Sequence, residues 1–105
     1  MEVENKHGEI LVLYQNDTGL WCCPICGSPE LDSAPYYENG SPSFQMCSCD
    51  FEYGFDDDPM ASGNAVEGVK NNWDLWRNKL LSSLSNKSEE YQKIKSDLKK
   101  IGIEI

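Results

Sequence analysis

The spacing of the hydrophobic residues divides the chain into two parts. Up to about residue 60, apolar residues form short runs or alternate with polar ones, which is typical of short strands separated by turns. From residue 63 onward they recur every three or four positions, which is the period of an α-helix. We therefore expect one α+β domain over residues 1–105, with an antiparallel β part over 1–60 and two amphipathic α-helices over 63–105.

Three segments of the first part predict strands and turns. The apolar run at 9–14 predicts a strand, and the polar stretch 15–19 after it predicts a turn. The pair Asn39-Gly40 predicts a tight hairpin turn between short strands at 35–38 and 43–47. These elements together describe a small, turn-rich β unit.

Two helices are predicted by residues that share one stripe of a helical surface. The first stripe comprises Val66, Val69, Trp73, Trp76 and Leu80. The second comprises Tyr91, Ile94, Leu98 and Ile101. Asn86 with Glu89 three residues later resembles a capping box, which predicts the start of the second helix, and Gly102 predicts its end.

Cysteine spacing adds a chemical interpretation to this β unit. Cys23 and Cys26 lie in a Cys-Pro-Ile-Cys-Gly sequence, and Cys47 and Cys49 lie in a Cys-Ser-Cys sequence about twenty residues later. Four thiolates from two turns suit a closed tetrahedral site, which is the usual structural site for Zn²⁺. We therefore predict a zinc ribbon with these four residues as metal ligands, although the neighbouring Cys22 is an alternative to Cys23.

The segment after the second pair of cysteines is expected to form an aromatic strand beside the metal site. Phe51, Tyr53 and Phe55 alternate with polar or small residues, so one face of that strand is aromatic and should cover the metal. A chain of 105 residues buries a limited share of its surface, so a metal would supply stability that a small core lacks.

Other chemistries fit the sequence less well. A rubredoxin-like iron site for electron transfer is the main alternative, since it also uses four thiolates, but the Cys-Ser-Cys pair departs from that pattern. His7, the only histidine, lies in a polar segment outside the cysteine motifs. A catalytic zinc site keeps one coordination position open and usually has histidine or carboxylate ligands, and the sequence shows neither feature. We therefore expect a protein that is not an enzyme.

Charge is distributed unevenly and bears on the choice of partner. Residues 1–62 hold twelve acidic side chains and one basic one, a net charge of −11, while residues 63–105 carry +2. Zinc ribbons that bind nucleic acid need Lys and Arg to neutralise phosphates, so we expect no nucleic-acid binding. An acidic face is suited to a protein with a basic surface, and we expect contacts from Asp56, Asp57, Asp58 and, as an apolar anchor, Trp76.

No segment indicates export or membrane insertion. The first nine residues are polar and the apolar run after them is too short for either purpose. An odd number of cysteines without an export signal favours a reducing compartment, so we expect a cytoplasmic protein. The sequence leaves the oligomeric state open.

Several of these motifs occur together in a known group of proteins. The motifs occur in this order along the chain: Cys23-Pro24-Ile25-Cys26-Gly27, Pro35-Tyr36, Ser43-Phe44-Gln45-Met46-Cys47, Phe51-Glu52-Tyr53-Gly54-Phe55-Asp56-Asp57 and Trp76-Arg77. In this respect the chain resembles small bacterial cysteine-rich, CPCC-like zinc-ribbon proteins over roughly half its length. It departs from them in the second turn, which lacks one residue and has Asp50 in place of glycine. The resemblance implies an immunity or inhibitor protein for a bacterial toxin, and a basic nuclease would suit the acidic face.

Overall fold

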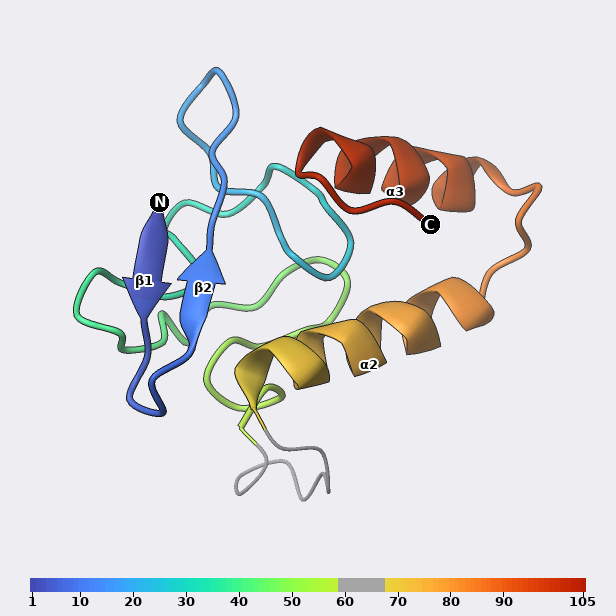
Figure 1. Ribbon diagram of the computed structural model, residues 1–105. Helices are drawn as coiled ribbons and strands as arrows, with labels where there is room; N and C mark the ends of the chain where they lie inside the picture. Colours follow the sequence, from blue (N-terminus) through green and yellow to red (C-terminus); the bar gives the residue numbers. More distant parts are fainter. Residues whose placement is uncertain (59–67) are drawn as a thin grey trace.

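The computed structural model describes residues 1–58 and 68–105 of the chain (Figure 1). The described elements are two short strands, β1 (Glu2–Glu4) and β2 (Ile10–Val12), the turns of residues 13–58, and two helices, α2 (Val69–Ser82) and α3 (Glu89–Lys100). The predicted α+β class is thus confirmed. Val66, which we assigned to the first helical stripe, lies outside the described residues.

The two strands form an antiparallel sheet in which Val3 pairs with Leu11. Both of these side chains face the core and are almost fully buried, whereas the residues on either side of each are exposed. The strand predicted at 9–14 is therefore present over Ile10–Val12. Its partner β1 was not predicted, because a three-residue strand with a single apolar side chain gives almost no periodic signal.

The remainder of the first part is built from turns rather than from regular strands. The predicted hairpin at Asn39-Gly40 is present, with Gly40 at φ 86° and the N–H of Tyr37 donating to the carbonyl of Ser41 at 2.9 Å. Its flanking strands are reduced to one bridge between Tyr36 and Pro42, since proline cannot donate to a ladder. Phe51 and Tyr53 are buried as expected, but Phe55 is 48% exposed and does not belong to the aromatic cover.

Helix α2 begins at a carboxylate supplied by the strand region. Glu9 accepts hydrogen bonds from the backbone N–H groups of Val69 at 2.8 Å and Lys70 at 3.2 Å. These donors have no partner within the helix, and a negative charge at a helix N-terminus is favourable. Glu9 therefore connects the sheet to the helical part over sixty residues of sequence.

Helix α3 begins later than predicted. Ser88 is its N-cap and accepts from the N–H of Tyr91 at 3.1 Å, so the capping box predicted at Asn86 is wrong. The end of the helix is as predicted, because Gly102 has φ 81° and the N–H of Ile103 donates to the carbonyl of Leu98 at 3.0 Å.

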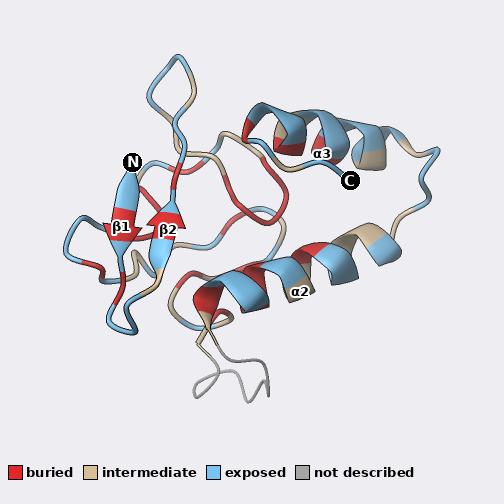
Figure 2. Ribbon diagram, in the orientation of Figure 1, coloured by how far each residue is buried: buried red, intermediate tan, exposed pale blue. Residues whose placement is uncertain are grey.

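One hydrophobic core includes residues from the turns, the sheet and both helices (Figure 2). Phe51 lies at its centre, with its ring 5.0 Å from that of Tyr53 and 5.6 Å from that of Trp76, both edge-on. Trp73 of α2 packs edge-on against Tyr53, and α3 contributes Leu98, which is fully buried. Among the described residues, neither helix has the length and hydrophobicity needed to cross a bilayer.

Candidate metal centre

Four cysteines from two distant turns meet in the interior. The Sγ atoms of Cys23, Cys26, Cys47 and Cys49 all lie within 4.8 Å of one another. Two pairs are closer, with 3.6 Å between Cys26 and Cys47 and 3.8 Å between Cys23 and Cys49. The four residues brought together are those that the spacing singled out.

The sulfur separations fit a tetrahedral metal site. With metal–sulfur bonds of about 2.3 Å, the ligand atoms of a regular tetrahedron are about 3.8 Å apart. The two shorter sulfur–sulfur distances agree with this value, and the upper limit of 4.8 Å leaves room for a small contraction. The residues present can therefore hold a metal ion such as Zn²⁺ or iron, and the four sulfurs would complete its coordination.

Each pair of cysteines is presented by a tight turn. In the first turn Gly27 has φ 80° and donates its N–H to the carbonyl of Cys23 at 2.6 Å, while the N–H of Ile25 points at the Cys23 sulfur at 3.4 Å. In the second, Asp50 has φ 70° and donates its N–H to the carbonyl of Cys47 at 2.9 Å. Aspartate is one of the few residues other than glycine that enter this region, which explains how the second turn forms without glycine.

Tyr53, in the turn that follows the second pair of cysteines, is a polar neighbour of the cluster. Its hydroxyl lies 2.7 Å from the sulfur of Cys23, and both side chains are buried. Burial alone would raise the pKa of the Cys23 thiol, but hydrogen bonds from the other three cysteines and from Tyr53 outweigh it and hold that pKa well below its usual value. The Tyr53 hydroxyl thus favours the thiolate form needed for metal binding.

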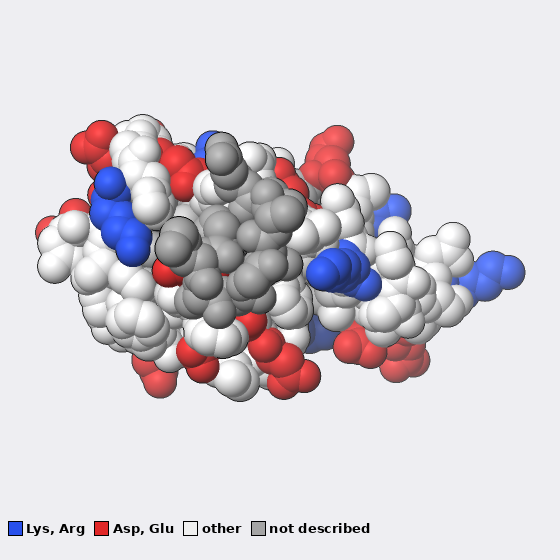
Figure 3. All heavy atoms as spheres, turned by 90° about the horizontal axis from the view of Figure 1, so that it is seen from below, with Lys and Arg blue, Asp and Glu red and all other residues white. Residues whose placement is uncertain are grey.

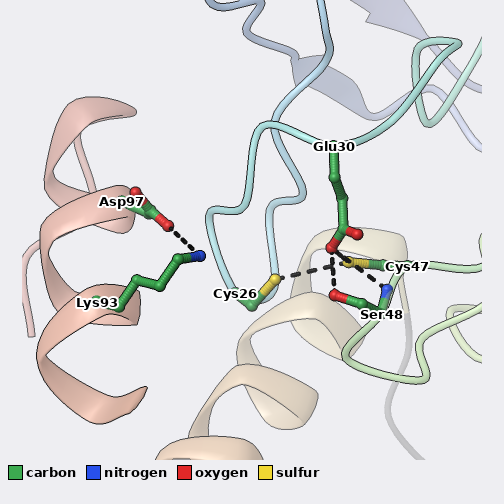
Figure 4. A network of polar contacts seen from close by, with 6 residues as sticks. All are labelled: Cys26, Glu30, Cys47, Ser48, Lys93 and Asp97. Atoms are coloured by element: carbon green, nitrogen blue, oxygen red, sulfur yellow. Dashed lines mark hydrogen bonds and ion pairs between the residues drawn. The ribbon is translucent and has the colours of Figure 1, made fainter. Parts of the chain in front are cut away.

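Glu30 approaches the second turn from outside (Figure 4). Its Oε1 atom accepts from the Ser48 hydroxyl at 2.5 Å and from the Ser48 N–H at 3.3 Å, and lies 2.9 Å from the Cys47 sulfur. A carboxylate bound to a turn hydroxyl and amide holds that turn in place. Nothing in the spacing of the sequence pointed to Glu30, because its contact depends on how two loops pack.

The opposite side of the cluster faces α3. Cys26 and Cys49 line a small cavity of about 130 Å³ together with Lys93 of that helix. The ammonium of Lys93 lies 3.3 Å from Asp97 in the same helix (Figure 4). Asp97 therefore offsets the positive charge of Lys93 on this side of the cluster.

Both helices are anchored on the first cysteine turn. Arg77 of α2 is largely buried and donates to the carbonyl of Pro24 from Nε at 3.0 Å and Nη2 at 2.5 Å, while Nη1 pairs with Asp74. Gly27 lies against α3 so closely that a Cβ atom there would be 2.6 Å from the backbone nitrogen of Leu98. The conformation of this turn therefore decides where both helices dock.

The remaining predicted site residues are placed differently. Cys22 lies outside the cluster and is half-buried against other clefts. Asp57 is fully buried, with its carboxylate accepting from the N–H of Gly54 at 2.7 Å and from Nε1 of Trp73 at 3.0 Å. A carboxylate in this position holds α2 against the β part, so it is unsuited to contact a partner.

Asp56, Asp58 and Trp76 are only half-buried. Trp76 packs on Phe51 in the core, and the ammonium of Lys79 lies 5.3 Å from the centre of its ring. Its indole N–H is buried, and no group among the described residues accepts a hydrogen bond from it. Most of this side chain serves the core, and only part of it is available as an anchor.

Comparison with known proteins adds nothing to this geometry. No protein-family model, curated protein or solved structure matches the chain. What can be said about function therefore comes from the four-cysteine cluster, which is compatible with a metal-binding module, and from the surface around it.

Proposed function

We propose that this protein is a protein-binding module that is held in shape by structural zinc and presents an acidic face to a partner with a basic surface. The observation that carries the proposal is the buried cluster of four cysteine sulfurs within 4.8 Å of one another. A closed set of four thiolates leaves no position for a substrate, so the ion acts on folding rather than on chemistry. In small zinc peptides such an ion contributes on the order of 10–16 kcal/mol to folding.

The charge distribution supports the choice of partner. Residues 1–58 contain twelve acidic side chains and one lysine, and four thiolates around a divalent ion would add about two further negative charges. Figure 3 shows one face of the molecule, on which acidic side chains occur around much of the outline while most of the basic ones lie in the right half. A field of this kind accelerates encounter with a basic surface more than it strengthens the final complex.

The partner-binding residues in this proposal are Asp56, Asp58 and Trp76, with Asp57 omitted because it is buried. A basic toxin, such as a nuclease, is the partner class that fits, and the module would act as its immunity protein or inhibitor. An inhibitor of this type works by covering a basic substrate-binding surface with carboxylates.

Two measurements test the metal part of this proposal. Protein purified from cells supplied with both zinc and iron should contain one zinc per chain by elemental analysis. Its absorption spectrum should show no band in the visible region. A coloured protein with one iron per chain would replace zinc by the rubredoxin-like alternative. Removal of the ion by a strong chelator should abolish the near-ultraviolet circular dichroism of the packed tryptophans, and an unchanged spectrum would contradict a structural role for the metal.

The binding part is tested with basic nuclease toxins as partners, measured by surface plasmon resonance. The variant D56N/D58N should associate at least fivefold more slowly, and the wild-type association rate should fall steeply with added salt. The matched control, E89Q/E90Q, removes the same charge from the start of α3 and should retain most of the rate. Equal rates for all three proteins would show that the acidic face is not where the partner binds.

A further inference from the structure

The outer edge of β2 is unpaired in the sheet. The N–H of Leu13 donates to the carbonyl of Met1 at 2.8 Å, and the N-terminal ammonium of Met1 donates back to the carbonyl of Leu13 at 2.7 Å. Hydrogen-bonded pairs alternate along an antiparallel ladder, so the peptide groups of Ile10 and Val12 point away from β1. Among residues 1–58 and 68–105, no other segment forms a hydrogen bond with these groups.

A neighbouring segment of the chain pairs with this edge next to Tyr14 but not along β2 itself. The N–H of Cys22 donates to the carbonyl of Tyr14 at 2.8 Å, so the chain that returns from the 15–19 turn lies along the edge just beyond β2. In the same register Pro24 would face Val12, but proline has no N–H, and its carbonyl is taken by Arg77 at 3.0 Å. Backbone pairing of this segment therefore ends before Val12, which leaves the outer N–H and C=O groups of β2 without a strand beside them.

A cleft of about 240 Å³ lies alongside this vacant position. Its walls are largely apolar and come from four parts of the fold: Val12 and Tyr14, Cys22 and Pro24 of the first cysteine turn, Trp73 and Arg77 of α2 beside the charged Lys70 and Asp74, and Ile101 and Ile103 after α3. The volume exceeds that of the cavity of about 150 Å³ that accepts a benzene molecule in a protein core. One leucine or phenylalanine side chain fits a space of this size.

The solvent side of the edge is apolar and bordered by carboxylates. Ile10, Val12 and Tyr14 are 43–47% exposed, and across the sheet from the first two lie Glu4 and Glu2. Exposed edge strands are usually protected by lysine or proline, and β2 has neither. An added strand would lie directly beside Ile10 and Val12, and long basic side chains on it would reach across these two residues toward Glu4 and Glu2, which lie one strand further away.

We propose that this edge binds an extended segment of a partner protein, which joins the sheet as a third strand beside β2 and places one apolar side chain in the cleft. Backbone hydrogen bonds to Ile10 and Val12 would supply affinity, and the cleft would select the residue that enters it. Lysine or arginine at the alternate positions of the segment would be favoured by Glu2 and Glu4. This site is distinct from the acidic segment in the proposed function, since neither Asp56 nor Asp58 lines the cleft.

The probe is a phage-displayed library of random dodecapeptides, selected on the full chain loaded with zinc. Selected peptides should share an apolar residue flanked at alternate positions by lysine or arginine, and they should perturb the amide resonances of Ile10 and Val12. The variant Val12→Pro removes the outward N–H without touching the ladder to β1, so synthetic peptides should bind it at least tenfold more weakly. The control Asp17→Pro places a proline in the exposed 15–19 turn, at a position that does not line the cleft, and should bind as wild type does.

A second arm leaves the protein unaltered. Peptides N-methylated at the amides that would face β2 should lose at least tenfold in affinity, while methylation of the intervening amides should have little effect. The proposal is overturned if no peptide is enriched, if Val12→Pro and wild type bind the selected peptides equally, or if N-methylation is without effect. Concentration-dependent dimers that disappear in Val12→Pro, with no peptide bound, would assign the edge to a second copy of the chain instead.

Discussion

The close contact between the first cysteine turn and α3 leads to a prediction about Gly27. At this position φ is 80°, and a Cβ atom would lie 2.6 Å from the nitrogen of Leu98, 2.7 Å from the carbonyl carbon of Asp97 and 2.9 Å from its Cβ. Two of these atoms belong to the helix backbone, so α3 must move for alanine to fit. Gly27→Ala therefore combines a left-handed alanine, which costs about 1–2 kcal/mol, with overpacking of about 1–3 kcal/mol.

Gly19→Ala is the matched control. Gly19 has φ 87°, but its Cβ would have nothing within 4 Å. We expect Gly19→Ala to lower the free energy of unfolding by about 1–2 kcal/mol and Gly27→Ala to lower it by roughly 2–5 kcal/mol. Urea unfolding followed by tryptophan fluorescence, with equal zinc present, measures both values.

Hydrogen exchange distinguishes the cause of this loss. If α3 is displaced, amides of Glu89–Lys100 should exchange faster in Gly27→Ala than in Gly19→Ala, while those of α2 change less. Equal stability losses and equal exchange in the two variants would refute the conclusion that α3 rests on the first turn.

Three further predictions concern single side chains. Tyr53→Phe removes the donor to Cys23 and should weaken zinc binding by roughly tenfold in a competition with a chromophoric chelator; unchanged affinity would show that the hydroxyl is not needed. Asp50→Gly relieves a left-handed aspartate and should raise the free energy of unfolding by about 1 kcal/mol in urea, whereas a loss would mean that the carboxylate has a role of its own. Burial raises the pKa of Asp57, so the folded state holds this proton more tightly than the unfolded chain does, and the free energy of unfolding should fall as pH rises between the two pKa values. Asp57→Asn should lack that part of the pH dependence and should be less stable at neutral pH by about 1–3 kcal/mol, because Gly54 and Trp73 donate to different carboxylate oxygens and only one of these positions remains an acceptor in asparagine. A pH dependence equal to that of wild type would contradict this.

Signals carried by neighbouring residues were readable from the sequence. The three-four spacing identified both helices, Asn39-Gly40 identified a turn, and Gly102 identified the end of α3. The cysteine spacing identified the four residues that converge. Each of these features depends on contacts within a few residues or on a short ligand motif, so the local sequence contains the information.

Features set by contacts between distant segments were not readable. Strand β1 exists because Val3 packs beside Leu11. The start of α3 was misplaced for a local reason: Asn86 and Ser88 are both favourable N-cap residues, and Ser88 is the one that accepts from the N–H of Tyr91. The choice of Cys23 over Cys22 was open in the sequence, since both lie one residue apart at the start of the same turn. The fold directs the first into the cluster and leaves the second beside a cleft.

The sequence by itself determined the two helices, strand β2 and the four cysteines of the cluster, because periodicity and cysteine spacing act over a few residues. Tertiary structure alone decided the roles of polar groups far apart in the chain. Glu9 caps α2, Arg77 holds the carbonyl of Pro24, and Asp57 is a buried structural carboxylate rather than part of an acidic surface. A buried polar group must find a partner wherever the fold provides one, and the position of that partner along the chain follows no local rule.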